Sequence, residues 1–311
     1  MKIAQELLRG DTRALARAIT LVENRHPSSQ DLLRAVFPHT GGASVVGITG
    51  APGSGKSTLV DGLAGLITRS GRNLGIVAVD PSSPFTGGAM LGDRIRMMRH
   101  STDPRVFIRS MAARGYLGGL ARGTADVVSL LEAAGKDLVL VETVGVGQDE
   151  VEVVRLAELV LVILTPDAGD DVQIFKAGIM EIADIFVLNK ADSPDCDTLE
   201  RRLDALLDSG GAKGTIPIPV MKTIAPSGEG IEDLWKEMQR CLGSRSPEER
   251  EKRQRHRISW MFKAILREKI AERLTDTLSE AEFELLVDSI SRREVDPYSL
   301  ADRVLQESRE V

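Results

Sequence analysis

The chain has 311 residues, of which 42 % are hydrophobic and 28 % charged, and it carries a net charge of −6 at pH 7. This length and composition are typical of a globular protein with one large or two smaller domains. The negative charge argues against nucleic acid or an anionic membrane as a partner, because both attract a basic surface.

Two further features bear on where the protein works. Residues 1–8 contain no apolar stretch that would direct secretion, and no run approaches the ~18 apolar residues that span a bilayer. The only cysteines, Cys196 and Cys241, lie far apart and fit no metal-ligand spacing, which favours reduced thiols in a reducing compartment. We therefore expect a cytoplasmic protein without a nucleic-acid or membrane partner.

Residues 1–42 are predicted to form three short helices. Apolar residues recur there at helical spacing, and Gly10-Asp11 ends the first helix and caps the second. A His-Pro-Ser-Ser segment at 26–29 separates the third helix from the second. We interpret this region as a helical amino-terminal extension.

Residues 43–243 alternate short apolar runs with helical segments. This pattern is typical of an α/β domain in which helices cover both faces of a parallel sheet. Ligands of such domains bind at the carboxyl edge of the sheet. The runs that we interpret as strands occupy residues 44–49, 74–79, 105–110, 138–142, 159–164, 185–188 and 217–222.

Residues 244–311 change character and are predicted to contain three helices. The spacing of Ser246 and Glu249 predicts a capping box at the start of the first helix, and similar signals start the other two. These helices cannot bury their apolar stripes alone, so we expect them to dock on the core or on another subunit. The run of mixed charge at 248–257 is predicted to be a solvated helix face.

The first apolar run of the middle region leads directly into a glycine-rich loop. The glycines allow backbone N–H groups to turn inward around phosphates, Lys56 reaches the β- and γ-phosphates, and the Ser57 hydroxyl faces Mg²⁺. A simple turn between strand and helix would explain the glycines but not Lys56-Ser57 at this spacing. The sequence therefore predicts a nucleoside triphosphate ligand. The predicted phosphate-binding residues are Gly50, Ala51, Pro52, Gly53, Ser54, Gly55, Lys56, Ser57 and Thr58.

The sequence Asn189-Lys190-Ala191-Asp192 follows an apolar run and indicates which base is bound. A carboxylate at Asp192 accepts from both N1–H and the N2 amino group of guanine, whereas adenine offers neither donor. Asn189 is expected to brace the loop, and the stem of Lys190 to lie over the base. A capping turn is the alternative interpretation. A second loop is expected to offer a backbone N–H to the guanine carbonyl; it contains Ile224, Ala225 and Pro226.

Three acidic residues are candidates for a magnesium site. Asp80 and Glu142 each end an apolar run, which predicts both at the carboxyl edge of the sheet. Asp93 lies in a glycine-rich segment, where a helix-capping role is an equal alternative. Mg²⁺ keeps several waters and takes one or two carboxylates, so not all three need to bind it directly. With Lys56 these residues form the predicted catalytic set, and with Ser57 the predicted metal ligands.

Gly145, just beyond Glu142, is placed to give its backbone N–H to the γ-phosphate and so to sense hydrolysis. No residue is an obvious water-positioning glutamine, and Gln148 is the nearest candidate. We therefore predict slow intrinsic hydrolysis that accelerates when a partner orders the loops. The candidates for additional positive charge are Arg94, Arg96 and Arg114.

With these motifs in place, the chain closely resembles the MeaB/ArgK family of G proteins over nearly its whole length. The runs that carry the resemblance are VDPSSP at 79–84, GDRIRM at 92–97, RGYLGGLA at 114–121 and VETVGVGQ at 141–148. It implies a P-loop GTPase domain of the SIMIBI class and a carboxyl-terminal helical arm that forms a homodimer. It also implies GTP, GDP and Mg²⁺ as ligands, and an adenosylcobalamin-dependent acyl-CoA mutase of the methylmalonyl-CoA type as the partner that the GTPase serves as a chaperone.

Within this resemblance, Asp80, Asp93 and Glu142 match family positions associated with Mg²⁺ and nucleotide switching. Residues 165–176 match a third switch that couples the nucleotide state to the mutase. The chain has Ile224-Ala225 where the family usually has Ser-Ala, and Asp-Asp at 170–171 where Asp-Glu is common. Because the guanine contact at 224–225 is expected from the backbone, the resemblance still implies GTP specificity.

Three other functions stay open from the sequence. The first is an ATP-dependent kinase linked to arginine or ornithine transport, which Asn189–Asp192 argues against. The second is a metallochaperone GTPase for nickel enzymes, which four scattered histidines and the absence of a Cys-x-x-Cys pair argue against. The third is a nucleotide-locked scaffold without catalysis.

Overall fold

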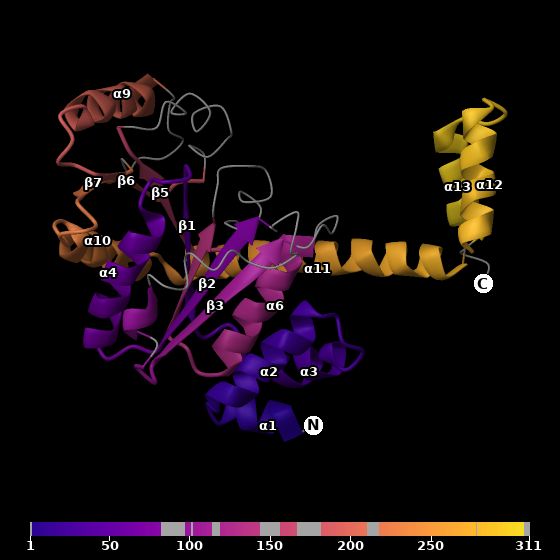
Figure 1. Cartoon of the computed structure of the whole chain (residues 1–311), viewed down its shortest axis with the longest axis horizontal. Coiled ribbons are helices and arrows are strands. Elements are labelled where there is room, and N and C mark those ends of the chain that lie inside the picture. Colours follow the sequence, from indigo (N-terminus) through magenta and orange to yellow (C-terminus); the bar gives the residue numbers. More distant parts are fainter. Residues whose placement is uncertain are drawn as a thin grey trace. The chain divides into compact units, whose positions relative to one another are not determined.

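Seven apolar runs form the strands of one sheet in the computed structural model, which describes residues 2–81, 97–100, 102–113, 119–143, 156–166, 182–209, 218–277 and 279–307 (Figure 1). All neighbouring strands run parallel, in the order β3-β2-β4-β1-β5-β6-β7. The predicted parallel sheet is confirmed. The strands are β1 Ser44–Gly50, β2 Leu74–Pro81, β3 Val106–Ala113, β4 Leu138–Thr143, β5 Leu159–Leu164, β6 Ile185–Asn189 and β7 Val220–Thr223.

The sheet is buried on both faces because successive strand side chains alternate between two apolar layers. Helices α4 (Lys56–Arg69) and α10 (Ile231–Ser244) pack on one face, where Leu63 and Trp235 share a cluster with residues of β1, β2, β4, β5 and β6. Helices α6 (Gly119–Ala133) and α9 (Cys196–Ser209) pack on the other face, where Leu199 joins residues of β5 and β6. This arrangement confirms the predicted α/β fold.

Three short helices precede the sheet: α1 (Lys2–Leu8), α2 (Thr12–Glu23) and α3 (Ser29–Val36), followed by a 3-10 turn η1 (Phe37–His39). Asp11 caps α2 as predicted, since its side chain accepts from the backbone N–H of Ala14 at 2.7 Å. Helices α2 and α3 pack against α6. In addition, Arg109 of β3 forms a partly buried ion pair with Glu23 of α2, so the extension is bonded to the sheet as well as to a helix.

The chain divides into two compact units, Met1–Arg257 and Ile258–Val311. Helix α11 (Pro247–Thr277) begins in the first unit and continues in the second, which also contains α12 (Glu280–Ser291) and α13 (Pro297–Glu307). Ser246 and Glu249 form the predicted capping box at the start of α11. The predicted division of the chain at 42 and 243 stays a prediction.

The charged run at the start of α11 differs from its prediction. Arg253 donates to the carboxylate of Asp184 at 2.7 Å, and Arg257 donates to that of Glu132 in α6 at 3.0 and 2.9 Å. Arg245, just before the helix, also donates to Asp184 at 3.0 Å. The side chain of Glu132 is only 1 % exposed and that of Arg257 15 %, so the predicted solvated face is wrong for Arg257, although most residues of the run 248–257 are exposed. We call these five residues the arginine clasp.

The clasp lies at the amino edge of the sheet, because Asp184 directly precedes β6. Asp184 also accepts from the backbone N–H of Val160 at 2.9 Å, which joins the starts of β5 and β6. Nearby, burial raises the pKa of Glu158, although Arg257 and Arg245 partly offset this shift. Burial also lowers the pKa of Arg245, because it disfavours the charged form of either group.

Three smaller features complete the fold. Within the described residues, no helix has both the length and the apolar character that crossing a membrane requires. Cys196 and Cys241 are free thiols, and burial raises the pKa of each. A short 3-10 helix, η2 (Met97–His100), packs on α4, where His100 Nε2 lies 3.0 Å from the carbonyl oxygen of Asp61.

Candidate nucleotide-binding site

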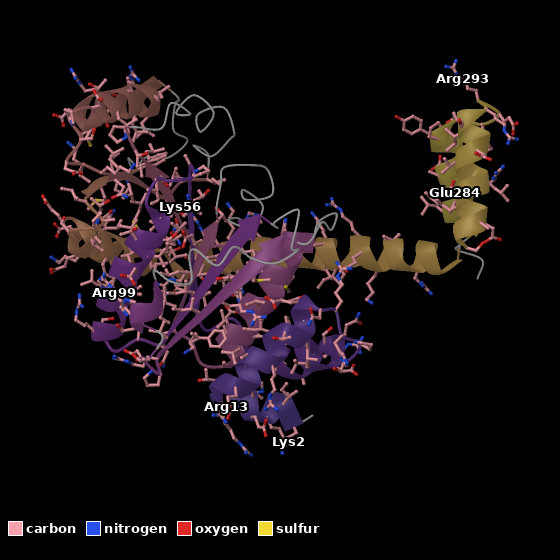
Figure 2. All side chains as sticks on the ribbon, in the orientation of Figure 1. Lys2, Arg13, Lys56, Arg99, Glu284 and Arg293 are labelled. Carbon is pink, nitrogen blue, oxygen red and sulfur yellow. The ribbon has the colours of Figure 1, made fainter. Side chains whose placement is uncertain are left out.

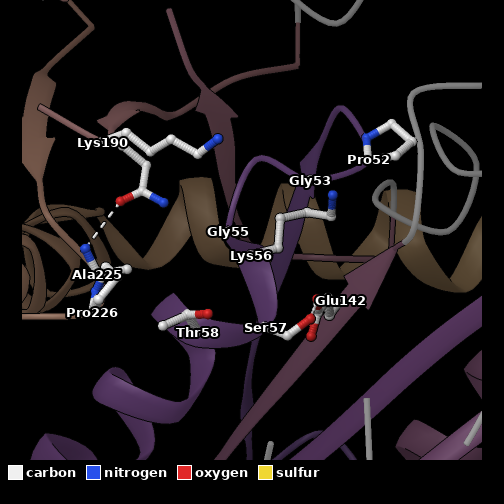
Figure 3. A pocket seen from close by; sticks show the side chains of 11 residues that line it. Pro52, Gly53, Gly55, Lys56, Ser57, Thr58, Glu142, Lys190, Ala225 and Pro226 are labelled. Carbon is white, nitrogen blue, oxygen red and sulfur yellow. Dashed lines mark hydrogen bonds between the residues drawn. The ribbon is translucent and has the colours of Figure 1, made fainter. Parts of the chain in front are cut away.

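The candidate site lies at the carboxyl edge of the sheet, at the point where β1 leads into α4 and where Figure 2 labels Lys56. The strand order reverses around the central β1, and parallel sheets bind ligands at such a switch point. A cavity of about 340 Å³ opens there (Figure 3). It is lined by Pro52, Gly53, Gly55, Lys56, Ser57, Thr58, Glu142, Asn189, Lys190, Ala225 and Pro226. All of these are residues singled out from the sequence, so the fold brings eleven members of the predicted set together.

The phosphate loop is held in shape by its own lysine. Lys56 is 6 % exposed, and its ammonium donates to the backbone carbonyls of Gly50 and Ala51, both at 2.8 Å. Gly50 and Gly55 have no room for a side chain, since a Cβ would clash with the Ile163 carbonyl at Gly50 and with the Asn189 amide at Gly55. Gly55 also has a φ of +87°, which favours glycine. The loop therefore needs glycine for both conformation and space.

Asn189, the last residue of β6, joins three loops. Its Nδ2 donates to the carbonyl of Ser54 at 2.8 Å, while its Oδ1 accepts from the Thr223 hydroxyl and from the Ala225 backbone N–H, each at 3.1 Å. Figure 3 marks the bond at Ala225 with a dashed line. The expected bracing role of Asn189 is confirmed. Thr223 was expected only as the first residue of the base-side loop; its bond to Asn189 appears once β7 pairs with β6 and places the two residues opposite each other.

The loop after β7 offers fewer free donors than expected. The Ala225 N–H, a candidate for the guanine carbonyl, is bonded to Asn189, and the Ile224 N–H donates to the carbonyl of Glu229 at 3.0 Å. Pro226 has no N–H to offer. Of the two residues of this loop that line the cavity, only Ala225 therefore has a backbone N–H. To contact a base, this N–H must share or exchange its hydrogen bond to Asn189.

Lys190, directly after Asn189, also lines the cavity. Lys190 has a φ of +58°, a left-handed conformation that costs a non-glycine residue about 1 kcal/mol or more. Such strain is found at functional sites, where the surrounding structure holds it in place. Asp192 is exposed and is not part of the lining, so its contact with guanine stays a prediction.

Two oxygen ligands for a divalent cation meet at the floor of the cavity. The Ser57 hydroxyl donates to Glu142 Oε1 at 2.6 Å, and Glu142 is only 4 % exposed. Hydroxyl and carboxylate oxygens suit Mg²⁺, so this pair fits the predicted metal. Asp80 lies on the neighbouring β2, where Ala78 pairs with Glu142, so its backbone is two residues nearer the carboxyl edge. Among the residues described by the structure, no group of three or more His, Cys, Asp or Glu gathers for a metal ion.

Several predicted residues lie outside the described part of the chain. They are Asp93, Gly145, Gln148, Arg94, Arg96, Arg114 and residues 167–176 of the expected third switch. Their assignments stay predictions.

The described residues are sufficient to define the chemistry of the site. A buried lysine, a glycine-rich loop and the positive end of α4 converge on one cavity and favour a polyphosphate. The oxygens of Ser57 and Glu142 add a place for the divalent cation that accompanies such a ligand. Phosphoryl transfer needs positioning and charge neutralisation rather than a covalent nucleophile, and these groups supply both.

Comparisons with known proteins agree with this chemistry. A family described as "Methylmalonyl Co-A mutase-associated GTPase MeaB" matches residues 15–279. A relative from Pyrococcus abyssi, named provisionally as a GTPase, is 48 % identical over 98 % of this chain and 96 % of its own. The mouse protein named methylmalonic aciduria type A homolog, mitochondrial, is 35 % identical over 83 % of this chain and 67 % of its own. Among solved structures, that of a LAO/AO transport system kinase matches with a TM-score of 0.72 and 26 % identity, covering 99 % of this chain and 97 % of the other.

Proposed function

This chain belongs to the family of methylmalonyl-CoA mutase-associated GTPases, and we propose that it serves an adenosylcobalamin-dependent acyl-CoA mutase as a GTP-hydrolysing chaperone. GTP hydrolysis follows from the family itself. The proposal goes beyond GTP hydrolysis in one respect: the chain controls the loading of cobalamin into the mutase and protects the mutase. The observation that supports it most is the match of this family over residues 15–279, which include every residue of the cavity lining.

In the proposed mechanism the protein binds the triphosphate along the loop from Gly50 to Thr58. Lys56 holds its positive charge against the β- and γ-phosphates, and the loop N–H groups orient them for attack by water. Asn189 keeps the phosphate loop and the base-side loop at a fixed spacing. Asp192 accepts from guanine, and its exposed side chain, which is not part of the cavity lining, is open to an incoming base.

Ser57 and Glu142 are the described residues that would hold Mg²⁺, with Asp80 and Asp93 as further candidates. When bound, the ion supplies neutralisation of the charge that develops between the β- and γ-phosphates. The Ser57 hydroxyl donates to Glu142 Oε1, so these two side chains lie next to each other.

The second unit supports a homodimer. Four apolar side chains spaced four residues apart on α11 are between 43 % and 62 % exposed: Ile258, Phe262, Leu266 and Ile270. A stripe of this kind on a helix is stabilised when another apolar surface covers it. We therefore expect a second copy of the chain on this stripe. Light scattering should give twice the chain mass for the wild type and a lower mass for Phe262→Asp, with Lys263→Asp, exposed one residue on, as the control.

The chaperone function is tested by adding a purified methylmalonyl-CoA mutase to the purified protein. We expect the mutase to raise the turnover of GTP at least about ten-fold, since none of the described residues of the site is an evident water-positioning group. A non-hydrolysable GTP analogue should hold the two proteins together on a sizing column, and GDP should not. Equal turnover with and without mutase, together with no nucleotide-dependent complex, would contradict the proposal.

The solved transport system kinase supports one alternative, a kinase linked to amino-acid transport. Calorimetry separates the two functions, because guanine selectivity depends on Asp192 and a kinase that uses ATP would not need it. We expect GTP to bind at least about 100-fold more tightly than ATP, and Asp192→Asn to remove most of this preference. Equal affinity for both nucleotides in the wild type would favour the kinase.

A further inference from the structure

Ser54 is a buried hydroxyl in the middle of the phosphate loop. It is 1 % exposed and stands between Gly53 and Gly55, which have φ angles of +77° and +87°. Its carbonyl accepts from Asn189 Nδ2 at 2.8 Å, and its N–H donates to the Ala51 carbonyl at 3.2 Å. Any residue would make these backbone contacts, so they leave the role of the hydroxyl open.

The hydroxyl of Ser54 faces the lysine of the loop. Lys56 Nζ lies 3.5 Å from Ser54 Oγ and donates to it. The same ammonium donates to the carbonyls of Gly50 and Ala51, both at 2.8 Å. The space around the hydroxyl is tight, because a Cβ on Gly50 would come within 3.1 Å of the same Oγ. A buried hydroxyl without a partner destabilises a fold. The contact with Lys56 thus satisfies Ser54 and limits where the ammonium can move.

We propose that Ser54 is a positioning residue for GTP hydrolysis, whose hydroxyl holds the Lys56 ammonium in the orientation from which it meets the phosphates. The contact with Ser54 and the two shorter bonds to carbonyls together limit the directions in which the ammonium points. The inference rests on the proposed placement of the phosphates at Lys56. Through the carbonyl of Ser54, the same residue also connects this lysine to Asn189 and the base-side loop.

The competing explanation is that Ser54 only fills space, in which case alanine would serve as well. The two explanations differ in which ligand is affected. Lys56 meets both the β- and the γ-phosphate of GTP but only the β-phosphate of GDP, so a misplaced ammonium weakens GTP more than GDP. A residue that only fills space would change the melting temperature and leave the ratio of the two affinities unchanged.

The test is a double-mutant cycle of Ser54→Ala and Lys56→Ala, read as dissociation constants for GTP and GDP and as turnover. We expect Ser54→Ala to raise the GTP dissociation constant about five-fold and that of GDP less than about two-fold, as the loss of one charge-assisted contact predicts. In the Lys56→Ala background the same change should have no effect on either. Ser129→Ala is the matched control, because it removes another buried hydroxyl, bonded to the Ala125 carbonyl in α6, and should change neither constant.

The outcomes separate the inference from the function on which it rests. If Lys56→Ala leaves GTP binding intact, the placement of the phosphates is wrong. If Lys56→Ala abolishes binding while Ser54→Ala changes nothing, or changes GTP and GDP alike, the positioning role is wrong. Should Ser54→Ala fold poorly, Ser54→Cys keeps the shape of the side chain with a slightly larger and weaker acceptor, and it should give a smaller change in the same GTP-to-GDP ratio.

Discussion

The two edges of the central sheet hold their buried cations in different ways. At the carboxyl edge, Lys56 donates to the backbone carbonyls of Gly50 and Ala51. At the amino edge, Arg245 and Arg257 donate to the carboxylates of Asp184 and Glu132. Carbonyl groups orient an ammonium without cancelling its charge, whereas a carboxylate cancels the charge of a guanidinium where it stands. The comparison indicates an edge that acts on an anionic ligand and an edge that holds the fold together.

The largest expected effect is at the carboxyl edge. Lys56→Ala removes the charge that faces the phosphates, so GTP turnover should fall about 100- to 1,000-fold. The melting temperature should change little, because the arginine clasp is intact. Phosphate release under saturating GTP measures turnover, with the half-exposed Lys222→Ala, which loses its ion pairs to Asp197 and Glu200, as the control. If the turnover of Lys56→Ala stayed within about three-fold of the wild type, the carboxyl edge would not be the edge that acts on the ligand.

The complementary change is at the amino edge. Arg257→Gln leaves the buried carboxylate of Glu132 without its guanidinium, and the free energy of unfolding should fall by about 3 kcal/mol. Turnover of the folded protein should stay within about two-fold, since the clasp lies at the other edge. Urea unfolding followed by circular dichroism measures the loss. The double variant Arg257→Leu and Glu132→Leu should lose less than Arg257→Gln alone, and a larger loss would argue that the pair is more than a structural contact.

An intermediate effect is expected at Asn189, which is neutral but fully bonded. Asn189→Ala leaves the Ser54 carbonyl and the Thr223 hydroxyl without their partner, a cost of about 1 to 3 kcal/mol. Because these bonds set the spacing of two loops, we expect the loss to appear as a GTP affinity weakened about ten- to 100-fold. Fluorescent-nucleotide titration measures it. A variant that melts earlier but binds GTP normally would place Asn189 with the arginine clasp as a purely structural residue.

The smallest effect concerns pH. Because burial raises the pKa of Glu158 above its unfolded value, the folded state binds this proton more tightly than the unfolded state does. Its contribution to stability is therefore complete below the unfolded pKa and is lost as pH rises through the folded value. Glu158→Gln removes this loss, so the variant should gain stability over the wild type between acidic and neutral pH. If the urea midpoints of Glu158→Gln and the wild type differed by the same amount at every pH, the raised pKa of Glu158 would be contradicted.

Much of the first unit could be predicted from local pattern. The seven strands appear in the sequence as apolar runs, and helix starts such as Asp11 and Ser246 appear through their capping spacing. The residues of the cavity could be found because phosphate and guanine recognition require particular residue types at short spacing. Asn189 is an example, since its bracing role follows from its place after a strand.

The roles that sequence reasoning missed depend on contacts between distant segments. Arg257 was expected in solvent, yet its partner Glu132 is 125 residues away and has no local signal. Thr223 acquires its role only through the pairing of β7 with β6. Ser54 was included as a loop residue, but the direction of its hydroxyl follows from the tight approach of Gly50. Pairings of this kind depend on the whole topology rather than on spacing along the chain.

The hydrogen bonds of Asn189 have a thermodynamic consequence. They link the phosphate loop to the base-side loop through the protein's own groups, so binding has little conformational entropy left to lose at these two loops. In a preassembled pocket of this kind, the backbone of the two loops takes the same conformation with the diphosphate as with the triphosphate. The signal that reports which nucleotide is bound must therefore originate elsewhere in the chain.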